Sequence, residues 1–454
     1  MAKFTLAEVL TATGGSCGQA QDLQFLDVST DTRTISDGCL FVALRGANFD
    51  GHDFLDKARE LGALAAIVEV GHGSDALPCI EVENTLRAYQ DLARFHRRRF
   101  SIPVIAITGS SGKTTTKDMV AAVLSTELNV LKTEKNFNNE IGLPKTLLQL
   151  TEEHEACVVE MGMRGLGQIE ELALIAEPTL GIVTNVGTSH IELLGSRENI
   201  GKAKAELIEC LPADSLAILN ADDDLVAAME SVAKGQVMTY GIDHDASVQA
   251  SHISYKKDGI SFVCQCLDNS FDVFLPMIGI HNVYDALAAI GAGAHVGISP
   301  DHMKEGLSVF TGTPMRQELV AFTDMVILND AYNANPSSMA EAIKALGQLE
   351  GHRKVAMIGD MLELGDFTEE GHRQTGRLLV EEGYDLVYTF GEAAKFVADE
   401  VRQGGVEVHV CSSHLEMANA YWDARQAGDV VLVKGSRGLR MERVVEELKE
   451  REEN

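Results

Sequence analysis

The sequence lacks any long apolar run. No segment approaches the roughly 18 uninterrupted apolar residues that a membrane-spanning helix requires, although 45% of the 454 residues are hydrophobic. The first ten residues include Glu8 and have no cationic stretch before an apolar one, so we expect no signal peptide. The composition is that of a globular protein with a real core, and the length suggests about three domains.

Positive charge is also scarce. The chain carries 38 Lys and Arg residues against 68 Asp and Glu residues, which gives a formal net charge of −30. General nucleic-acid binding is excluded, because phosphate backbones require basic stripes. The basic run 97–99 is short, and we expect it to be a solvated helix end before a strand. Solubility is the simplest reason for the acidic excess, so local positive groups must hold any anionic substrate.

Closely spaced cysteines are nearly absent. The eight cysteines are scattered, and only Cys264 and Cys266 lie near each other, two apart in an alternating segment. Both are expected to face one side of a strand as structural thiols, which is a simpler interpretation than a metal site. Reduced thiols are typical of the cytosol, so we expect a cytoplasmic protein.

The order of segments predicts an α/β fold with three domains, at 1–83, 84–312 and 313–454. In the middle range a helix at 84–98 precedes an apolar strand at 103–108, and further strands alternate with helices. This alternation predicts a mostly parallel sheet. Around 258–259 the pattern indicates a hairpin within an antiparallel ribbon at 246–276. The last range repeats the alternation and is predicted to be Rossmann-like.

The segment 108–115 reads TGSSGKTT and lies between an apolar strand and a helix. Glycines let the backbone wrap a phosphate, and the helix N-terminus adds N–H donors. Lys113 can neutralise phosphate charge, and the Thr114 hydroxyl is placed to reach Mg²⁺. Ile107 stands where the strict motif has its first glycine. The segment predicts ATP or GTP binding through Gly109, Ser110, Ser111, Gly112, Lys113, Thr114 and Thr115.

Two further groups follow predicted strands. Glu160 ends the strand 157–159, and His190 follows the strand 180–184. Ligands bind beyond the carboxyl ends of strands in open α/β sheets, so Glu160, His190 and Thr114 are candidate ligands for one or two Mg²⁺ ions. Each residue alone also has a simpler interpretation than a metal ligand: Glu160 as an exposed strand end and His190 as a loop histidine. Lys204 alone reads as a solvated helix lysine.

These segments together resemble the Mur ligase family over essentially the whole chain. The loop 108–115 is similar to the family's ATP loop, with Ser111 where asparagine is commoner. The resemblance implies that Glu160 and His190 bind Mg²⁺ and that Lys204, with Lys202 as the alternative, carries a carbamate that holds a second Mg²⁺. Lys113, His190 and Lys204 are the implied catalytic residues.

The resemblance extends to segments that contact nucleotide and substrates. The run 279–289 is similar to a nucleotide-contacting helix start, where Asn282 is the implied contact and Asp285 replaces a frequent asparagine. Asp330 is implied to accept from ribose hydroxyls. Arg316 is implied to bind ATP, although a hinge salt bridge is an alternative. The implied substrate residues are Ser29, Asp31, Arg33, Gly46, Asp50, His52, Asn136, Asn138, Asn139, Asn333, Asn335, Lys434, Ser436 and Arg437.

Several segments resemble the family's D-alanyl-D-alanine-adding members. These are a UDP-binding pattern at 28–52 and the runs 333–339, 359–365 and 434–437. The resemblance implies a monomeric ligase that uses ATP and Mg²⁺ to join D-alanyl-D-alanine to UDP-MurNAc-tripeptide through an acyl phosphate. For Lys434 and Arg437, helix-capping charge is the alternative role.

Other functions remain possible from sequence. The same chemistry serves the diaminopimelate-adding or lysine-adding ligase and folylpolyglutamate synthetase, although the UDP-type N-terminal pattern opposes the folate enzyme. A nucleotide-driven switch or motor would hydrolyse ATP without an amino-acid substrate, and it leaves 1–83 unexplained. A purely structural role leaves the phosphate loop unused.

Overall fold

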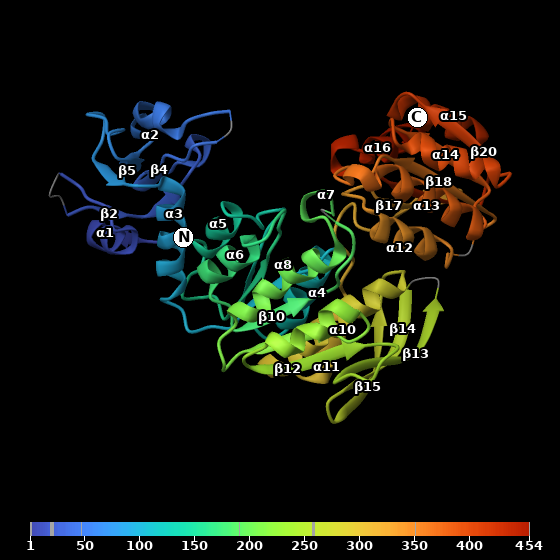
Figure 1. Ribbon diagram of the computed structural model, residues 1–454, viewed down its shortest axis with the longest axis horizontal. Helices are drawn as coiled ribbons and strands as arrows, with labels where there is room; N and C mark the ends of the chain where they lie inside the picture. The colour runs from blue at the N-terminus through green and yellow to red at the C-terminus, as the bar shows by residue number, and fades with distance from the viewer. Residues whose placement is uncertain are drawn as a thin grey trace.

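The computed structural model describes residues 2–18, 22–46, 48–189, 191–256, 259–349 and 351–453. Within these residues the strands form sheets of two, four, nine and six strands, and helices cover the larger sheets (Figure 1). The predicted α/β class is confirmed. None of the described helices is long and apolar enough to cross a membrane.

The N-terminal sheet is parallel and has the order β3-β4-β5-β6. Its strands are β3 (Asp27–Ser29), β4 (Cys39–Val42), β5 (Ala63–Glu69) and β6 (Cys79–Val82). A small antiparallel pair joins β1 (Phe4–Thr5) and β2 (Gln24–Phe25). The helical segments here are α1 (Leu6–Thr13), η1 (Thr32–Thr34), η2 (Gly51–Phe54) and α2 (Leu55–Glu60).

Helix α3 (Thr85–Arg97) connects this part to the central sheet, and Asn84 caps its first turn. The prediction of a solvated basic end is wrong for Arg97, which is only 7% exposed. Its guanidinium donates to the carbonyls of Ala176, Phe100 and Glu177 at 3.0, 2.7 and 3.2 Å. The carbonyls at the end of α6 (Gln168–Ala176), together with that of Phe100, therefore hold this cation inside the protein.

The central sheet has the order β15-β14-β13-β12-β11-β10-β7-β9-β8. Its parallel strands are β7 (Val104–Thr108), β8 (Val130–Lys132), β9 (Ala156–Glu160), β10 (Leu180–Val183), β11 (Leu216–Asn220) and β12 (Gln236–Gly241). Its helical segments are α4 (Lys113–Leu124), α5 (Gly142–Leu147), α6 (Gln168–Ala176), α7 (Ile191–Leu194), α8 (Arg197–Cys210), α9 (Asp224–Ala227), η3 (Ala228–Val232), α10 (Ile280–Val296) and α11 (Pro300–Ser308).

The antiparallel ribbon is confirmed at the edge of this sheet. It consists of β13 (Val248–Lys256), β14 (Gly259–Cys266) and β15 (Asn269–Leu275). The predicted turn residue Asp258 lies outside the described residues. Cys264 and Cys266 both point into the apolar cluster under the ribbon, as predicted, and burial raises the pKa of both thiols.

The C-terminal sheet has the order β16-β17-β21-β18-β19-β20, with β16 antiparallel to the rest. Its strands are β16 (Glu318–Ala321), β17 (Met325–Asp330), β18 (Arg353–Gly359), β19 (Leu386–Phe390), β20 (Glu407–Cys411) and β21 (Asp429–Lys434). Its helical segments are α12 (Pro336–Leu346), η4 (Gly365–Phe367), α13 (Thr368–Glu381), α14 (Ala394–Gln403), α15 (His414–Ala424), η5 (Arg437–Leu439) and α16 (Glu442–Glu453).

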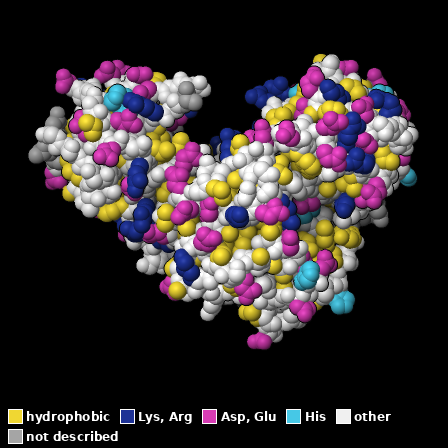
Figure 2. All heavy atoms as spheres, in the orientation of Figure 1, with side chains coloured by type: hydrophobic (Ala, Val, Ile, Leu, Met, Phe, Trp, Pro, Cys, Tyr) yellow, Lys and Arg dark blue, Asp and Glu magenta, His cyan; other side chains and the backbone are white. Residues whose placement is uncertain are grey.

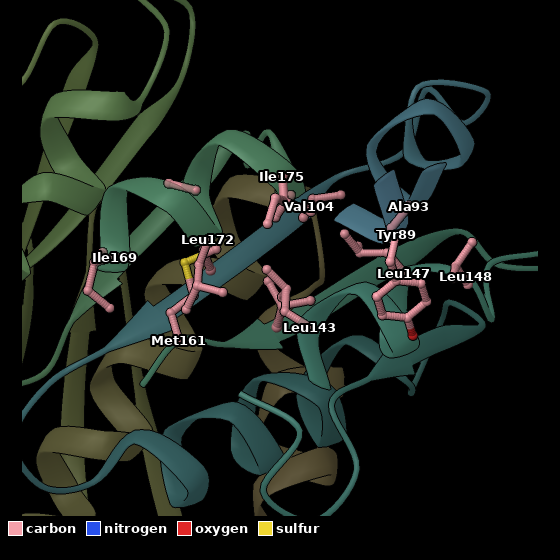
Figure 3. Packing of buried hydrophobic residues seen from close by; sticks show 14 of the residues in the cluster. Tyr89, Ala93, Val104, Leu143, Leu147, Leu148, Met161, Ile169, Leu172 and Ile175 are labelled. Atoms are coloured by element: carbon pink, nitrogen blue, oxygen red, sulfur yellow. The ribbon is translucent and has the colours of Figure 1, made fainter. Parts of the chain in front are cut away.

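Alternating side chains of the strands divide the core between the faces of each sheet. In β7, Val104 and Ala106 face a cluster that includes α3, α5, α6 and α8, whereas Ile105 and Ile107 face α4 and α10. Figure 3 shows part of the first cluster, where Tyr89 of α3 packs beside Leu147 of α5. The first cluster continues into the N-terminal part through α3, so this helix anchors both sheets.

The molecule has a V-shaped outline, with the N-terminal part on the left arm and the C-terminal part on the right (Figures 1 and 2). A deep notch separates the two arms, and the central part forms the base. The predicted domain ranges 1–83, 84–312 and 313–454 remain a prediction, although each contains one of the larger sheets.

Candidate active site

The phosphate loop joins β7 to α4 and depends on two glycines. Gly109 has φ +157°, and a Cβ there would lie 1.8 Å from Oγ1 of Thr184. Gly112 has φ +79° and precedes the first turn of α4. Only glycine fits the first position, because a side chain would collide with the end of β10. The loop therefore passes close to the neighbouring strand and leads into the N-terminus of α4, where backbone N–H groups are available to an anion.

Lys113 folds back over this loop. Its Nζ donates to the carbonyl of Gly109 at 2.7 Å and lies 3.5 Å from the carbonyl of Ser110. Burial lowers the pKa of Lys113, and the carboxylate of Glu160 opposes that shift. The ammonium is thus held at the rim of the loop by carbonyl groups that a phosphate could replace.

Oxygen donors from the start of α4 and the end of β9 meet beside the loop. The Thr114 hydroxyl donates to Oε2 of Glu160 at 2.8 Å, and Nδ2 of Asn138 donates to Oε1 at 2.8 Å. Glu160 is only 3% exposed, which rules out the solvated strand end. A hydroxyl and a carboxylate in contact are the donor types that Mg²⁺ prefers, so the residues fit this ion. His190, the third predicted ligand, lies outside the described residues.

Helix α8 points Lys204 into the protein. Lys204 is 2% exposed, whereas Lys202 on the same helix is exposed. Burial, with a smaller contribution from Lys113, lowers the pKa of Lys204 well below that of an ordinary lysine. The structure therefore separates two lysines that sequence alone left as alternatives, and it places only Lys204 in an environment that favours a neutral amine.

A cavity of about 900 Å³ lies over the phosphate loop, between the central and C-terminal sheets. Most of the residues predicted for ATP, metal or substrate binding in these two parts line it. They are Ser110, Ser111, Gly112, Lys113, Thr114, Thr115, Asn136, Asn138, Asn139, Glu160, Asn282, Arg316, Asp330, Asn333, Asn335, Lys434 and Arg437. Gly109, Lys204 and Ser436 lie behind this lining rather than in it.

The C-terminal sheet contributes a buried ion pair to the cavity wall. Nζ of Lys434 donates to Oδ2 of Asp330 at 2.5 Å and to the carbonyl of Asn333 at 3.0 Å. The other Asp330 oxygen accepts from the backbone of Gln317 at 3.2 Å. Both side chains lie at the ends of adjacent parallel strands, β17 and β21. Lys434 therefore fixes Asp330 in place and does not act as a helix-capping charge.

Arg316 enters the cavity from the segment that links the two sheets. Its guanidinium carbon lies 4.0 Å from the ring centre of Tyr332, and that of Arg437 lies 5.8 Å from the same ring. No ion pair within 4.0 Å joins Arg316 to a carboxylate of the described residues, so the hinge salt bridge is not observed. The charge of Arg316 does partly oppose the raised pKa of the Asp285 carboxyl. A cation that rests on an aromatic face keeps its N–H groups available to an anion.

Helix α10 adds two polar side chains. Asn282 is 1% exposed and donates through Nδ2 to the carbonyl of Ile278 at 2.6 Å. Asp285 accepts from the Thr116 hydroxyl at 2.8 Å and adjoins the backbone of Gly112. Burial raises the pKa of Asp285 to about 8. The aspartate that replaces a frequent asparagine is therefore part of the wall of this cavity.

Two asparagines, one in the central part and one in the C-terminal part, form hydrogen bonds that stabilise helix starts near the cavity. Asn139 accepts from the N–H of Gly142 at 2.9 Å, at the start of α5. Asn335 caps α12 and donates to the Ser189 hydroxyl of the central part at 2.7 Å. Both side chains therefore fix the ends of helices, and Asn335 also links the two parts across the cavity.

Ser436 has a hydroxyl that is already engaged. It accepts from the N–H of Leu362 at 2.8 Å and donates to the carbonyl of Ala334 at 3.2 Å. With 3% exposure, it connects the three loops that follow β17, β21 and β18. This arrangement favours a positioning role rather than the direct substrate contact that the resemblance implied.

The N-terminal candidates do not reach this cavity. Asp31 and Arg33 pair with each other, and Nε2 of His52 accepts from the backbone of Glu69 at 3.0 Å. Asp50 also binds the His52 ring, while Gly46 donates to the carbonyl of Phe49. Asp50, Gly46 and Ser29 belong to the N-terminal part of the chain, between β3 and η2, and none of them lines the cavity. Their predicted UDP contacts stay a prediction and require a surface separate from the phosphate loop.

Sequence reasoning missed several residues in and around the cavity; Tyr332 and Glu341 line it, and Asn185 lies beside the phosphate loop. Tyr332 supports two arginines, Asn185 accepts from the backbone of Ser111 at 3.0 Å, and Glu341 of α12 faces the Ser111 side chain. Asn185 lies in the strand-end segment that also contains His190, so its position was a usable signal. Glu341 carries no such signal, because it sits in the middle of an ordinary amphipathic helix.

Three family descriptions match consecutive parts of the chain. Residues 26–97 match the Mur ligase family, catalytic domain, residues 107–293 the Mur ligase middle domain, and residues 315–437 the Mur ligase, glutamate ligase domain. These matches follow the order of the three larger sheets and together leave only short segments unmatched.

Full-length relatives agree with these matches. The UDP-N-acetylmuramoyl-tripeptide--D-alanyl-D-alanine ligase of Bacillus subtilis is 39% identical, with 99% of each chain covered. The ligase of the same name from Escherichia coli is 36% identical, again with 99% of each covered.

Solved structures give the same result in three dimensions. Crystal structure I of MurF from Acinetobacter baumannii has a TM-score of 0.93 and 31% identity, with 99% of each chain covered. MurF ligase from Thermotoga maritima in complex with ADP has a TM-score of 0.85 and 30% identity, covering 94% of this chain and 98% of that one. Sequence, fold and site agree, and the chain belongs to the Mur ligase family.

Proposed function

We propose that this chain joins D-alanyl-D-alanine to UDP-N-acetylmuramoyl-tripeptide and uses ATP to drive the reaction. The names of its relatives in Bacillus subtilis and Escherichia coli support these substrates. The observation that carries the proposal is the meeting of Lys113, Glu160 and Arg316 in one cavity. The phosphate loop supplies one cation, the C-terminal segment supplies another, and Glu160 at the end of β9 supplies a carboxylate suited to a metal.

The chemistry must activate a carboxylate, because its oxygen is a poor leaving group. An oxygen of the terminal tripeptide carboxylate attacks the γ-phosphorus of ATP, the bond from that phosphorus to the β-γ bridging oxygen breaks, and ADP leaves. Lys113 and the N–H groups of the loop stabilise charge on the transferring phosphoryl group. The amine of the dipeptide then attacks the acyl carbon, loses a proton, and expels phosphate that carries the former carboxylate oxygen.

Thr114 and Glu160 are the described residues that would hold Mg²⁺, with His190 as a further ligand. The ion supplies positive charge that offsets the charge of the phosphates. Lys204 faces the same side as Lys113, and its lowered pKa favours the neutral amine that combines with carbon dioxide to give a carbamate. A carbamate on Lys204 would add two oxygen donors beside the phosphate loop. Its presence predicts activity that falls when dissolved carbon dioxide is removed.

Closure of the notch completes the proposal. The N-terminal candidates and the cavity lie on different parts, and an acyl phosphate must be protected from water. The segment after Gly312 contains Met315 and Gln317 at φ +59° and +51°, so two non-glycine residues hold a left-handed backbone at the junction. We propose hinges there and near residue 84. Scattering curves that do not change when ATP analogue and substrates are added would contradict this closure. We propose that the reaction takes place in the cytoplasm, because ATP and nucleotide-linked substrates are made there.

The decisive assay measures phosphate release from ATP and Mg²⁺ with UDP-MurNAc-tripeptide, with and without D-alanyl-D-alanine. Release that requires both substrates, with a UDP-pentapeptide product by mass, is expected. Release without either substrate would favour a nucleotide-driven switch. If the protein is active only on UDP-MurNAc-dipeptide and a diamino acid, the ligation mechanism still holds, but the amine substrate is the diamino acid rather than D-alanyl-D-alanine.

A further inference from the structure

The turn 313–316 leads from the central part into the C-terminal part. The N–H of Arg316 donates to the carbonyl of Thr313 at 3.0 Å, which closes a turn of four residues. Pro314 is its second residue, and Met315, with φ +59°, is its third, where a turn of this kind usually has glycine. A left-handed backbone costs free energy in a residue with a side chain, so surrounding contacts must hold the turn in this shape.

The two ends of this turn are fixed to different parts of the protein. The N–H of Met315 donates to Oε2 of Glu318 at 3.0 Å, and the Met315 carbonyl accepts from the N–H of Tyr332 at 3.1 Å, both in the C-terminal part. The Thr313 hydroxyl instead donates to Oδ2 of Asp118 in α4, at 2.8 Å. The boundary between the two parts therefore falls between Thr313 and Met315, and Asp118 holds the central side of it.

Asp118 is a fixed and charged acceptor. Its side chain lies on the helix that begins at Lys113, and the residue is only 8% exposed. Its other oxygen, Oδ1, accepts from Nζ of Lys132 at 2.7 Å and lies 3.2 Å from Nζ of the buried Lys117. Burial alone would raise the pKa of Asp118, but the two lysines and the Thr313 hydroxyl lower it below its ordinary value. The bond from Thr313 is therefore a charge-assisted one, made inside the protein.

Arg316 lies opposite a second cation and depends on this support. Arg316 and Lys113 both line the cavity. Burial lowers the pKa of Lys113, and the charge of Arg316 lowers it further, so the two cations repel each other. The ring of Tyr332 holds Arg316 from the C-terminal side, and the carbonyl of Thr313 holds its backbone from the central side. Two cations that converge on one cavity suit a chain of phosphates, which attracts both.

We propose that Asp118 is a positioning residue, which ties the turn to the phosphate-loop helix through Thr313 and so places Arg316 beside Lys113 for the phosphates of ATP. This inference rests on ATP binding within the proposed function, and it adds a residue that does not line the cavity. When the C-terminal part rotates, the residues after Pro314 move while Thr313 stays with α4. The bond to Asp118 therefore fixes the point from which Arg316 swings toward the nucleotide, and its loss spreads Arg316 over unproductive positions.

The first test removes only the hydroxyl that Asp118 accepts. Thr313→Val is expected to raise the Kd of a non-hydrolysable ATP analogue and the KM for ATP about tenfold, with the KM for D-alanyl-D-alanine changed less than about twofold. Thr126→Val is the matched control, because this half-buried threonine follows the end of α4, donates to the carbonyl of Val123 at 2.7 Å and does not line the cavity. The control should bind the analogue as the parent does. Parent-like binding by Thr313→Val would overturn the inference.

A double-mutant cycle separates positioning from a general loss of structure. Thr313→Val should weaken binding of the analogue about tenfold in the parent but less than about twofold in Arg316→Ala, because the bond to Asp118 acts through Arg316. The same weakening in both backgrounds would overturn the inference. Asp118→Asn should reproduce the pattern of Thr313→Val if it folds, and the Thr313 cycle decides the matter if it does not.

The parent protein distinguishes this inference from the proposed function. A parent that binds the ATP analogue but releases no phosphate in response to the tripeptide substrate and D-alanyl-D-alanine would refute the proposed function alone. A parent that does not bind the analogue would refute both.

Discussion

The hydroxyl of Thr114 donates to Oε2 of Glu160 at 2.8 Å, joining the first turn of α4 to the end of β9. Thr114→Ser keeps this donor and should retain most activity. Glu160→Gln removes the charge and turns an amide donor toward Asn138 or Thr114, so we expect kcat/KM to fall about 100-fold. The Mg²⁺ concentration for half-maximal rate should also rise in Glu160→Gln. An unchanged Mg²⁺ dependence in that variant would contradict the assignment.

Gly109→Ala should damage nucleotide binding more than a glycine change elsewhere. Its Cβ would lie 1.8 Å from Thr184, so the loop must move, and displacements of this size cost about 100-fold in kcat/KM for ATP. Gly167→Ala is the matched control, since Gly167 also has positive φ but has open space around its Cβ. The control should lose about 1 kcal/mol of stability and little activity. Similar kinetics for the two variants would refute the close-approach argument.

Asp285→Asn should stabilise the protein at alkaline pH. Folded Asp285 keeps its proton until about pH 8, against an ordinary value of 3.8. Between those values the folded state binds more protons than the unfolded state, so this group makes stability fall as pH rises. Asparagine cannot ionise and still accepts from Thr116. Urea unfolding should show a larger gain at about pH 9 than at about pH 5, and an equal gain at both would contradict the buried-carboxyl account.

Arg97→Ala should destabilise the protein by about 3 kcal/mol, because it leaves buried carbonyls at the end of α6 without their charged donor. Arg98→Ala is the control. Arg98 is mostly exposed and pairs with Glu177 at the surface, so its loss should change stability by less than about 0.5 kcal/mol. Equal unfolding midpoints for the two variants would show that the interior position of Arg97 has no energetic consequence.

The sequence was sufficient to predict those site residues whose position depends only on the order of strands and helices. The carboxyl ends of parallel strands lie at one edge of the sheet, so the Gly-rich loop after one strand and Glu160 at the end of another were expected to lie close together. The same logic predicted the central parallel sheet and its antiparallel ribbon. Resemblance to a family added the roles of residues such as Asn282, whose place in the cavity no local pattern indicates.

Other features depend on tertiary contacts that no local pattern carries. Arg97 reads as a surface cation, yet it donates to two carbonyls of a distant segment, Ala176 and Glu177, as well as to that of nearby Phe100. Glu341 reaches Ser111 only because α12 packs against the phosphate loop. The edge strand β20 shows little β character in sequence, because Glu407 and most of its other residues are exposed. Burial of Lys204 but not Lys202 likewise follows from how α8 is rotated against the sheet.

The central claim is that ATP activates the tripeptide carboxylate as an acyl phosphate before the dipeptide amine attacks. The most direct measurement supplies UDP-MurNAc-tripeptide whose terminal carboxylate is labelled with ¹⁸O, together with ATP, Mg²⁺ and D-alanyl-D-alanine. The account predicts one ¹⁸O atom in each phosphate released and a UDP-pentapeptide product in equal amount. Two results would contradict it. One is released phosphate that contains no ¹⁸O, and the other is release of unlabelled phosphate that continues when the dipeptide is left out.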